Sequence, residues 1–277
     1  MQIVKNHIIQ GKHQKPILLD YGYLVNGQAK PVVVFAHGFK GFKDWGHFNK
    51  VMEHFITEGF GFVKFNFSHN GGTVEQPIDF PDLEAFGNNN FSKELDDLKT
   101  VLDWVSNNDI DEINKEEIYL IGHSRGGGVS VLAANEDYRI KKLVTWAAVA
   151  DLINRFSQQE LDYWKEQGVI YVENTRTNQQ MPMYYQIVED TLKNRERFDI
   201  ELAANSISIP HLIIHGTDDM AVPVTDAHKL NAWNNKSDLH IINGANHTFG
   251  VAHPHHEEQL PDHVVEVLAK TIEFFQK

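Results

Sequence analysis

The stretch LIGHSRGGGVS, residues 120–130, holds one serine between two glycines directly after an apolar run. The run predicts a strand and the residues after it predict a helix, so only three residues remain for the turn. Such a turn forces Ser124 into a strained backbone conformation and points its hydroxyl outward at the top of a sheet. Gly122 and Gly126 are expected because a Cβ atom at either position would collide with the adjacent strand or helix. The pattern is typical of a nucleophile, which needs a base, an acid and hydrogen-bond donors for negative charge.

Around this stretch, apolar runs alternate with longer amphipathic segments, which predicts an α/β fold with a mostly parallel central sheet flanked by helices. We predict strands near Gln2–Ile9, Ile17–Leu24, Val32–Ala36, Phe60–Phe67, Glu117–Ile121, Lys142–Ala147, His211–His215 and Leu239–Ile242. Helices are expected near Trp45–Glu58, Phe91–Ser106, Arg125–Ala134 and Asp262–Phe275. The first two strands are expected to form a meander at the sheet edge, and residues 68–90 a long polar loop.

Residues 151–208 break this alternation. They contain two helix-like segments and a hairpin-like one between them, and they exceed an ordinary connection several-fold. We interpret them as a cap over the carboxyl edge of the sheet, where open α/β sheets bind ligands. The core would then comprise residues 1–150 and 209–277. The alternative is a helical insertion far from any pocket.

Composition limits the partners. The 277 residues carry a net charge of -13 and no basic cluster, so nucleic acid and anionic membrane surfaces are not expected to bind. No cysteine is present, which excludes disulfides and thiolate metal sites. No segment is long and apolar enough to span a membrane, and the first residues do not resemble a secretory leader. We therefore expect a cytoplasmic protein. Its oligomeric state is left open, with a dimer allowed.

Position selects the base from the 16 histidines. His247 lies after the last predicted strand and before the last predicted helix, so it emerges at the same sheet edge as the serine. His240 lies inside the strand and is expected to be structural. His253, His255 and His256 could bind a metal, but they crowd one short loop without helical spacing. We therefore predict no metal site and take His247 as the base.

The acid should reach the histidine from another loop of that edge. Asp218 and Asp219 both follow the strand that ends near His215, and consecutive side chains diverge, so only one of them can point at the base. Asp151, after an earlier strand, is a further candidate.

Several motifs in one order resemble the α/β-hydrolase fold, in particular its single-domain esterases and its dienelactone-hydrolase-like and prolyl-oligopeptidase-like members. GHSRGG resembles the nucleophile elbow, HGTDDMAVP the segment that carries the acid, and GANHTF the catalytic-histidine loop. The resemblance implies a triad of Ser124, Asp219 and His247. HGFKG resembles the oxyanion loop, which implies that the Phe39 and Arg125 backbone N–H groups stabilise the oxyanion.

Departures from these relatives narrow the expected substrate. A dienelactone hydrolase would carry a cysteine nucleophile, and proline-specific peptidases usually add a propeller for which 277 residues leave no room. No apolar lid facing a lipid surface is evident. The resemblance thus favours a serine hydrolase that cleaves small-molecule carboxylic esters or thioesters through an acyl-enzyme, without a cofactor. Acyl transfer or perhydrolysis by the same triad, or ligand sensing with negligible turnover, are the alternatives.

Bulky cap side chains are candidates for the substrate pocket, and they are Trp164, Tyr171, Met181, Met183, Tyr184 and Tyr185. Each could instead pack the cap onto the sheet. We predict that Met183 and Tyr184 contact the acyl group, which is expected to be of moderate size and aromatic, with a cinnamoyl-type ester as one candidate.

Overall fold

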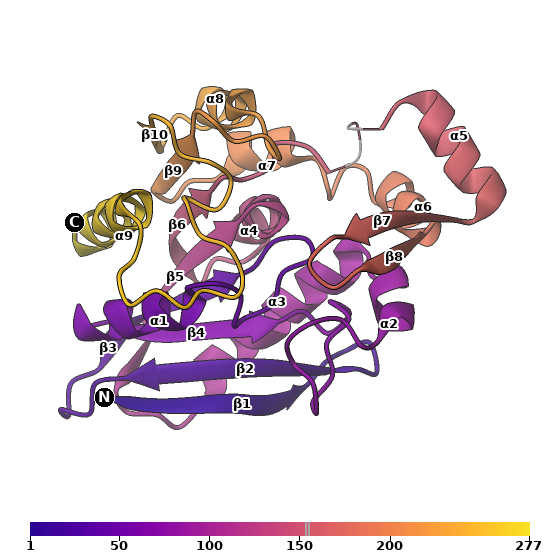
Figure 1. Cartoon of the computed structure of the whole chain (residues 1–277). Helices are drawn as coiled ribbons and strands as arrows, with labels where there is room; N and C mark the ends of the chain where they lie inside the picture. The colour runs from indigo at the N-terminus through magenta and orange to yellow at the C-terminus, as the bar shows by residue number, and fades with distance from the viewer. Residues whose placement is uncertain (153, 155) are drawn as a thin grey trace.

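A computed structural model describes residues 1–152, 154 and 156–277 of the chain. One sheet of eight strands runs through the molecule in the order β1-β2-β4-β3-β5-β6-β9-β10 (Figure 1). The strands are β1 (Gln2–Gln10), β2 (Pro16–Tyr23), β3 (Lys30–Ala36), β4 (Gly61–Asn66), β5 (Ile113–His123), β6 (Ile140–Trp146), β9 (His211–Gly216) and β10 (Ser237–Ile242). β1 and β2 pair antiparallel at one edge, and from β4 to β10 every pairing is parallel. The predicted α/β-hydrolase architecture is confirmed.

Helices cover both faces of the sheet because the parallel strands are apolar on both sides, as in the VVVFA run of β3. On one face lie α1 (Phe48–Thr57) and α9 (Asp262–Gln276). The opposite face carries α3 (Phe91–Asn107), α4 (Arg125–Glu136), α7 (Ile200–Ser206) and α8 (Val224–Trp233). The side chain of Asn90 caps α3 by accepting the Lys93 backbone N–H.

Three helices were not expected from the sequence. α2 (Leu83–Gly87) lies within the predicted loop 68–90, where the Asp82 carboxylate caps five residues with two apolar buried side chains. α7 has seven residues, and α8 begins after Pro223 with only a weak apolar stripe. Short or weakly patterned helices depend on tertiary packing, so the predicted loop is corrected at α2.

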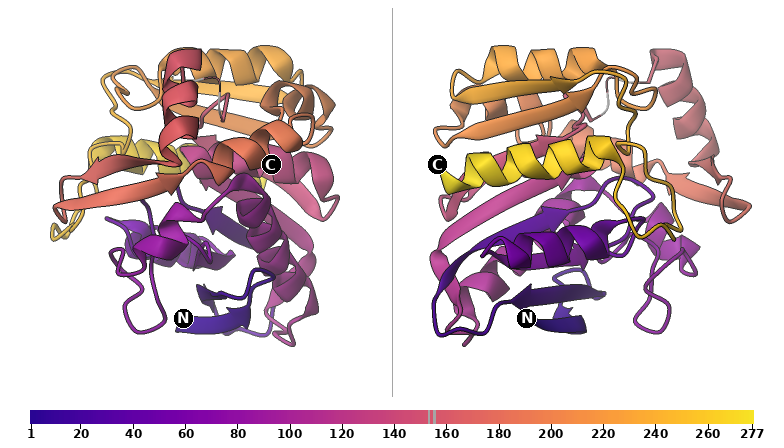
Figure 2. Two further views of the ribbon diagram at one scale, coloured as in Figure 1. Left: turned by 90° about the vertical axis from the view of Figure 1, so that its right-hand side faces the viewer. Right: turned by 60° about the vertical axis from the view of Figure 1, so that its left-hand side comes forward.

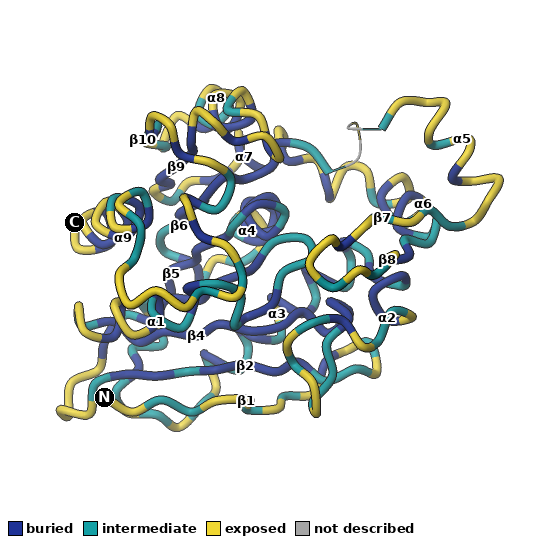
Figure 3. The backbone as a smooth tube through the Cα atoms, viewed as in Figure 1, coloured by how far each residue is buried: buried dark blue, intermediate teal, exposed yellow. Residues whose placement is uncertain are grey.

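The segment after β6 contains α5 (Gln158–Gln167), the hairpin β7 (Val169–Asn174) and β8 (Gln179–Tyr184), and α6 (Gln186–Lys193). α5 and the hairpin project at one end of the molecule in both Figures 1 and 2. α5 is mostly exposed (Figure 3), with Trp164 as its one buried residue. α7 packs against α4 of the core although it lies within 151–208. The predicted division at residues 151 and 208 stays a prediction.

Among the described residues, no helix combines the length and the apolar character needed to cross a bilayer.

Candidate active site

Ser124 occupies the turn between β5 and α4 with φ 58° and ψ -123°. Residues other than glycine rarely adopt this backbone conformation. The turn is tight on both sides. A Cβ atom on Gly122 would lie 2.5 Å from the Gly126 carbonyl oxygen, inside α4. One on Gly126 would lie 2.3 Å from the His37 carbonyl oxygen, just after β3. The two glycines therefore permit the strained turn, as the sequence predicts.

His247 lies in the loop after β10 and reaches the serine directly. Its Nε2 is 2.9 Å from Ser124 Oγ, and its Nδ1 is 2.7 Å from Asp219 Oδ2. This arrangement suits a neutral imidazole whose Nδ1–H donates to the carboxylate while Nε2 accepts the serine hydroxyl. Proton transfer from Ser124 to His247 is thus geometrically available.

The Asp219 carboxylate is held on both oxygens. Oδ1 accepts the backbone N–H groups of Ala221 and Val222, each at 2.8 Å, and Oδ2 lies 3.3 Å from His215 Nε2. Burial alone would raise the pKa of Asp219. The hydrogen bonds from His215, His247 and Val222 outweigh it and hold that pKa well below its usual range, so the carboxylate is charged at neutral pH.

The two rival carboxylates lie elsewhere. Asp218 Oδ1 accepts the Thr217 hydroxyl at 2.8 Å, and Asp151 accepts the backbone and side-chain N–H groups of Asn154. Of the three candidates, the structure brings Asp219 to the imidazole.

His123, the residue before the serine, supports the histidine loop. Its Nε2 lies 3.0 Å from the His247 carbonyl oxygen, and the two rings stand 4.9 Å apart. Burial, with the neighbouring His247, lowers the pKa of His123 to about 3, so it stays neutral and donates this hydrogen bond. Sequence reasoning missed this role, although the residue stands inside the serine motif.

The loop after β3 carries the predicted oxyanion donor Phe39. Gly38 packs against the serine so closely that a Cβ there would lie 3.3 Å from Ser124 Oγ. His37 Nδ1 donates to the Gly38 carbonyl at 2.9 Å. That carbonyl belongs to the same peptide plane as the Phe39 N–H, so the bond orients the N–H in the opposite direction. Burial lowers the pKa of His37 to about 4, although this hydrogen bond opposes the shift, and the ring stays neutral.

A buried network of two lysines and two aspartates fixes the same loop to the sheet. Lys43 Nζ lies 2.8 Å from Asp20, and Lys64 Nζ lies 2.7 Å from the other oxygen of Asp20 and 2.5 Å from Asp44. Asp20 and Lys64 are fully buried. Removing one member would leave an unpaired buried charge, so the group holds the loop to β2 and β4.

Arg125 supplies the second predicted donor through its backbone N–H at the start of α4. Its side chain turns away to pair with Glu94, and its guanidinium stacks 4.7 Å from the Phe39 ring centre. The Arg125 side chain therefore ties the two predicted oxyanion elements together.

Two pockets meet at Ser124 and His247. The first has a volume of about 360 Å³ and mostly apolar walls, some of them from residues 151–208. Its lining residues are Phe39, Lys40, Phe91, Ser124, Arg125, Val149, Asp151, Leu152, Phe156, Trp164, Val172, Met183, Ile187, Val188, Ala221, Val222 and His247. We call it the apolar pocket. The second, about 340 Å³, lies toward the histidine loop and includes Lys40, Trp45, Asn174, Arg176 and His253. We call it the histidine-side pocket.

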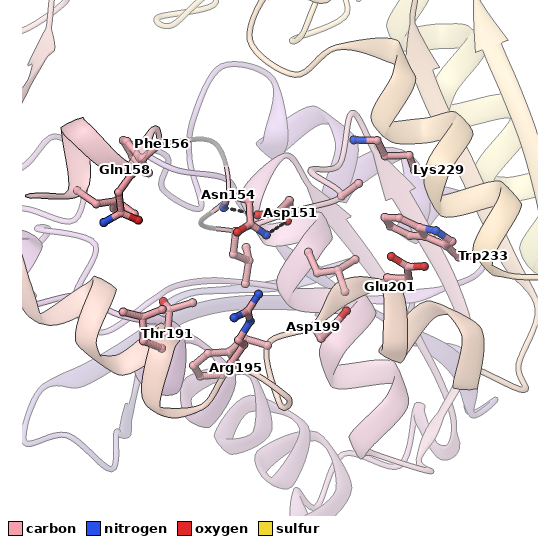
Figure 4. A pocket seen from close by; sticks show the side chains of 16 residues that line it. Asp151, Asn154, Phe156, Gln158, Thr191, Arg195, Asp199, Glu201, Lys229 and Trp233 are labelled. Atoms are coloured by element: carbon pink, nitrogen blue, oxygen red, sulfur yellow. Dashed lines mark hydrogen bonds between the residues drawn. The ribbon is translucent and has the colours of Figure 1, made fainter.

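A larger cavity of about 670 Å³ shares Asp151, Leu152 and Phe156 with the apolar pocket (Figure 4). It is lined by charged side chains such as Arg195 and Glu201, and neither Ser124 nor His247 is among its described lining residues. Its size therefore does not make it the reaction site.

The two predicted substrate contacts separate in the structure. Met183 lines the apolar pocket, whereas Tyr184 is not among its described lining residues. Tyr184 instead donates to Glu84 at 2.5 Å and packs on Gly87 of α2, because neighbouring residues of a strand face opposite sides. Its predicted contact with the acyl group is corrected accordingly.

No group of three potential metal-binding side chains occurs among residues 1–152, 154 and 156–277. Of the three histidines considered as metal ligands in the sequence analysis, His253 accepts the Gly46 backbone N–H on its Nδ1 at 2.8 Å. His240 lies 2.7 Å from Glu266, away from the serine, as a structural residue would.

The sequence matches the prolyl oligopeptidase family over residues 47–275. No curated protein matches it. Among solved structures, Est1E from Butyrivibrio proteoclasticus with ferulic acid bound is 19% identical, with a TM-score of 0.74 over 98% of this chain and 97% of that one. The esterase domain of a Rhodothermus marinus protein is 18% identical, with a TM-score of 0.66 over 99% and 98%. The monoacylglycerol lipase of Paleococcus ferrophilus is 16% identical, with a TM-score of 0.66 over 94% and 98%.

Proposed function

Since the chain belongs to the prolyl oligopeptidase family of α/β-hydrolase-fold hydrolases, we propose that it cleaves carboxylic esters through an acyl-enzyme on Ser124. The observation that carries the proposal is the continuous contact from Ser124 Oγ through the imidazole of His247 to Asp219, at 2.9 Å and 2.7 Å. Ser124 and His247 also line the apolar pocket, which is large enough for an acyl group.

In the first half of the reaction, Ser124 Oγ attacks the ester carbonyl while His247 Nε2 takes the hydroxyl proton. Asp219 fixes the imidazole tautomer and stabilises the imidazolium. The backbone N–H groups of Phe39 and Arg125 receive the oxyanion, where one donor is typically worth about 3 kcal/mol. The tetrahedral intermediate then expels the alcohol, which takes its proton from His247.

In the second half, a water molecule gives its proton to His247 and attacks the acyl carbonyl. The intermediate collapses, the ester bond to Ser124 breaks, and the serine oxygen recovers the proton from the imidazolium. Apart from the ester and water, these steps use only groups of this chain, so the proposed reaction requires no cofactor.

The apolar pocket supports an acyl group of moderate size. Phe91, Trp164 and Met183 supply aromatic and thioether walls that suit a flat apolar group. Est1E binds ferulic acid, which has such a group. We propose an aromatic acyl ester, with a cinnamoyl-type ester as the first to test.

The test compares Ser124→Ala with Ser130→Ala, a buried serine of α4 that the mechanism does not use. Ser124→Ala should lose labelling by a fluorophosphonate probe and several orders of magnitude of p-nitrophenyl ester turnover, whereas Ser130→Ala should keep both. A cinnamoyl ester should also be cleaved much faster than the matching anilide. Persistent labelling of Ser124→Ala would overturn the proposal, and faster cleavage of the anilide would indicate a peptidase.

A further inference from the structure

The histidine-side pocket differs in charge from the rest of the protein. The chain carries a net charge of -13, yet no aspartate or glutamate is among the described residues that line this pocket. Its lining includes Lys40 and Arg176 and the three histidines 123, 247 and 253. A cationic pocket in an acidic protein is an electrostatic feature that favours anions.

Of the two cationic side chains in this pocket, Lys40 is less neutralised by neighbouring carboxylates than Arg176. Its Nζ donates to the Glu173 backbone carbonyl at 3.0 Å, which is a neutral acceptor. Within the part of the chain that the structure describes, Lys40 makes no ion pair with a carboxylate. Among the described residues, no paired carboxylate offsets the charge of this ammonium, which lines both the histidine-side pocket and the apolar pocket.

Arg176 comes from the turn between β7 and β8 and is held in place. It pairs with Asp79, and its guanidinium lies 5.8 Å from the Phe42 ring centre. One carboxylate shares a guanidinium with five N–H donors, so the remaining donors stay available to a second acceptor. The ion pair thus fixes the position of Arg176 as well as reducing its charge.

The reaction itself assigns this pocket to the alcohol. His247 must protonate the leaving oxygen, so the alcohol departs on the side of the histidine loop, which supplies Thr248, Ala252 and His253 to this wall. The acyl group then occupies the apolar pocket.

We propose that the histidine-side pocket binds the alcohol portion of the ester and that this alcohol carries a negative charge. The inference rests on the proposed function and adds the chemical class of the leaving group. Lys40 and Arg176 are the residues that select the charge.

The experiment uses two esters that share a butyryl acyl group. One releases 4-(carboxymethyl)phenol and the other its neutral carboxamide isostere, so the leaving oxygens are nearly equal in reactivity. We expect kcat/KM to favour the carboxylate ester by roughly twofold to fivefold, as for a partly solvated ion pair. Added salt should lower that preference because it screens the charges.

Variants then test the residues through the ratio of the two rates. Lys40→Met and Arg176→Gln should each bring the carboxylate-to-carboxamide ratio toward one, and Lys40→Glu should bring it below one. Lys165→Met, an exposed change on α5 at a residue that lines none of these pockets, should leave the ratio unchanged. A purely structural role of Lys40 would change both rates equally and preserve the ratio, which would overturn the inference.

The two proposals fail differently. If Ser124→Ala cleaves the esters as fast as the unaltered protein, the proposed hydrolysis is wrong. If hydrolysis depends on Ser124 but the ratio is one or lower, only the anionic leaving group is wrong. A preference for a carboxylate on the acyl group instead, tested with a phenyl hemiglutarate and its amide, would also overturn the assignment of the pocket.

Discussion

Asp218 and Asp219 are chemically identical neighbours that the loop after β9 directs to different partners. Asp219 is buried and receives two backbone N–H groups and the imidazole, whereas Asp218 is exposed and meets a threonine hydroxyl. The difference follows from backbone direction, because consecutive side chains cannot point to the same place. It predicts unequal effects of the same substitution.

Asp219→Asn should lower kcat on the order of 10⁴-fold because the amide no longer selects the imidazole tautomer that accepts the serine proton. Asp218→Asn should change kcat by much less. Steady-state kinetics on one p-nitrophenyl ester, with circular dichroism to confirm folding, measures both. Equal losses would show that the loop has been assigned wrongly.

Two histidines beside the triad position backbone groups of the site. His37 orients the peptide that carries the Phe39 N–H, and His123 holds the carbonyl of the histidine loop. Each stands inside a motif that the sequence analysis recognised, His37 in HGFKG and His123 in GHSRGG, so position in a motif was the signal in the sequence. Their hydrogen bonds could not be predicted, since they depend on which carbonyl lies within reach after folding.

Among the secondary-structure elements, β8 has consecutive residues that face different parts of the molecule. Met183 faces the apolar pocket, and the Trp164 indole N–H donates to its backbone carbonyl at 2.8 Å. Tyr184 faces α2, where it binds Glu84. Alternation along the strand therefore places one residue in the wall of the apolar pocket and the next against α2.

Met183→Ala should lower kcat/KM for a cinnamoyl ester by roughly tenfold or more, since about 1–3 kcal/mol of pocket contact is lost. Turnover of an acetyl ester should change little, because its acyl group is too short to reach the side chain. Tyr163→Ala, an exposed change on α5, is the matched cap control. Equal losses for both esters in Met183→Ala would mean that the residue supports the fold and does not select the substrate.

At the scale of the whole molecule, buried histidines couple stability to pH. Burial lowers the pKa of His37 to about 4, and it lowers the pKa of His211 to about 3. For His123, burial and the nearby His247 together bring the pKa to about 3. The unfolded chain takes up these protons near pH ~6.5, whereas the folded chain stays neutral. Stability is therefore full above that pH and falls as the pH drops toward 3.

One buried carboxyl acts in the opposite direction. Burial raises the pKa of Asp97 to about 7, although hydrogen bonds from Ser68 oppose the shift. The folded state then holds a proton that the unfolded state releases, so this group favours folding as the pH falls from 7 toward 4. Three histidines outweigh one carboxyl, so a net loss of stability is expected.

The free energy of unfolding should fall by several kcal/mol between pH 7 and pH 4.5, since each proton taken up contributes about 1.4 kcal/mol per pH unit. His211→Gln should flatten this slope by about one proton because glutamine does not titrate. The exposed change His228→Gln should leave the slope unaltered. Urea titrations at several pH values measure all three, and a slope independent of pH in the unaltered protein would contradict the prediction.

The fold class, the succession of strands along the chain, and the serine, acid and histidine motifs could all be predicted from the amino-acid sequence. Local patterns are sufficient for these, because an apolar run, a tight Gly-x-Ser-x-Gly turn and a loop after a strand are written in neighbouring residues. α2 was not predicted because five residues are too few to show the helical period of apolar residues. Its formation depends on packing around the buried Phe86.

The lining of the pockets could not be predicted from the sequence, because it depends on how distant segments pack together. Met183 and Tyr184 differ by one position, and the way β8 packs in the fold sets which of them lines the apolar pocket. Lys40, Arg176 and His253 lie far apart in the sequence and line one pocket only because the loop after β3, the hairpin and the histidine loop meet at the same sheet edge. Contacts between segments distant in the chain leave no local pattern, so the charge of that pocket became visible only in three dimensions.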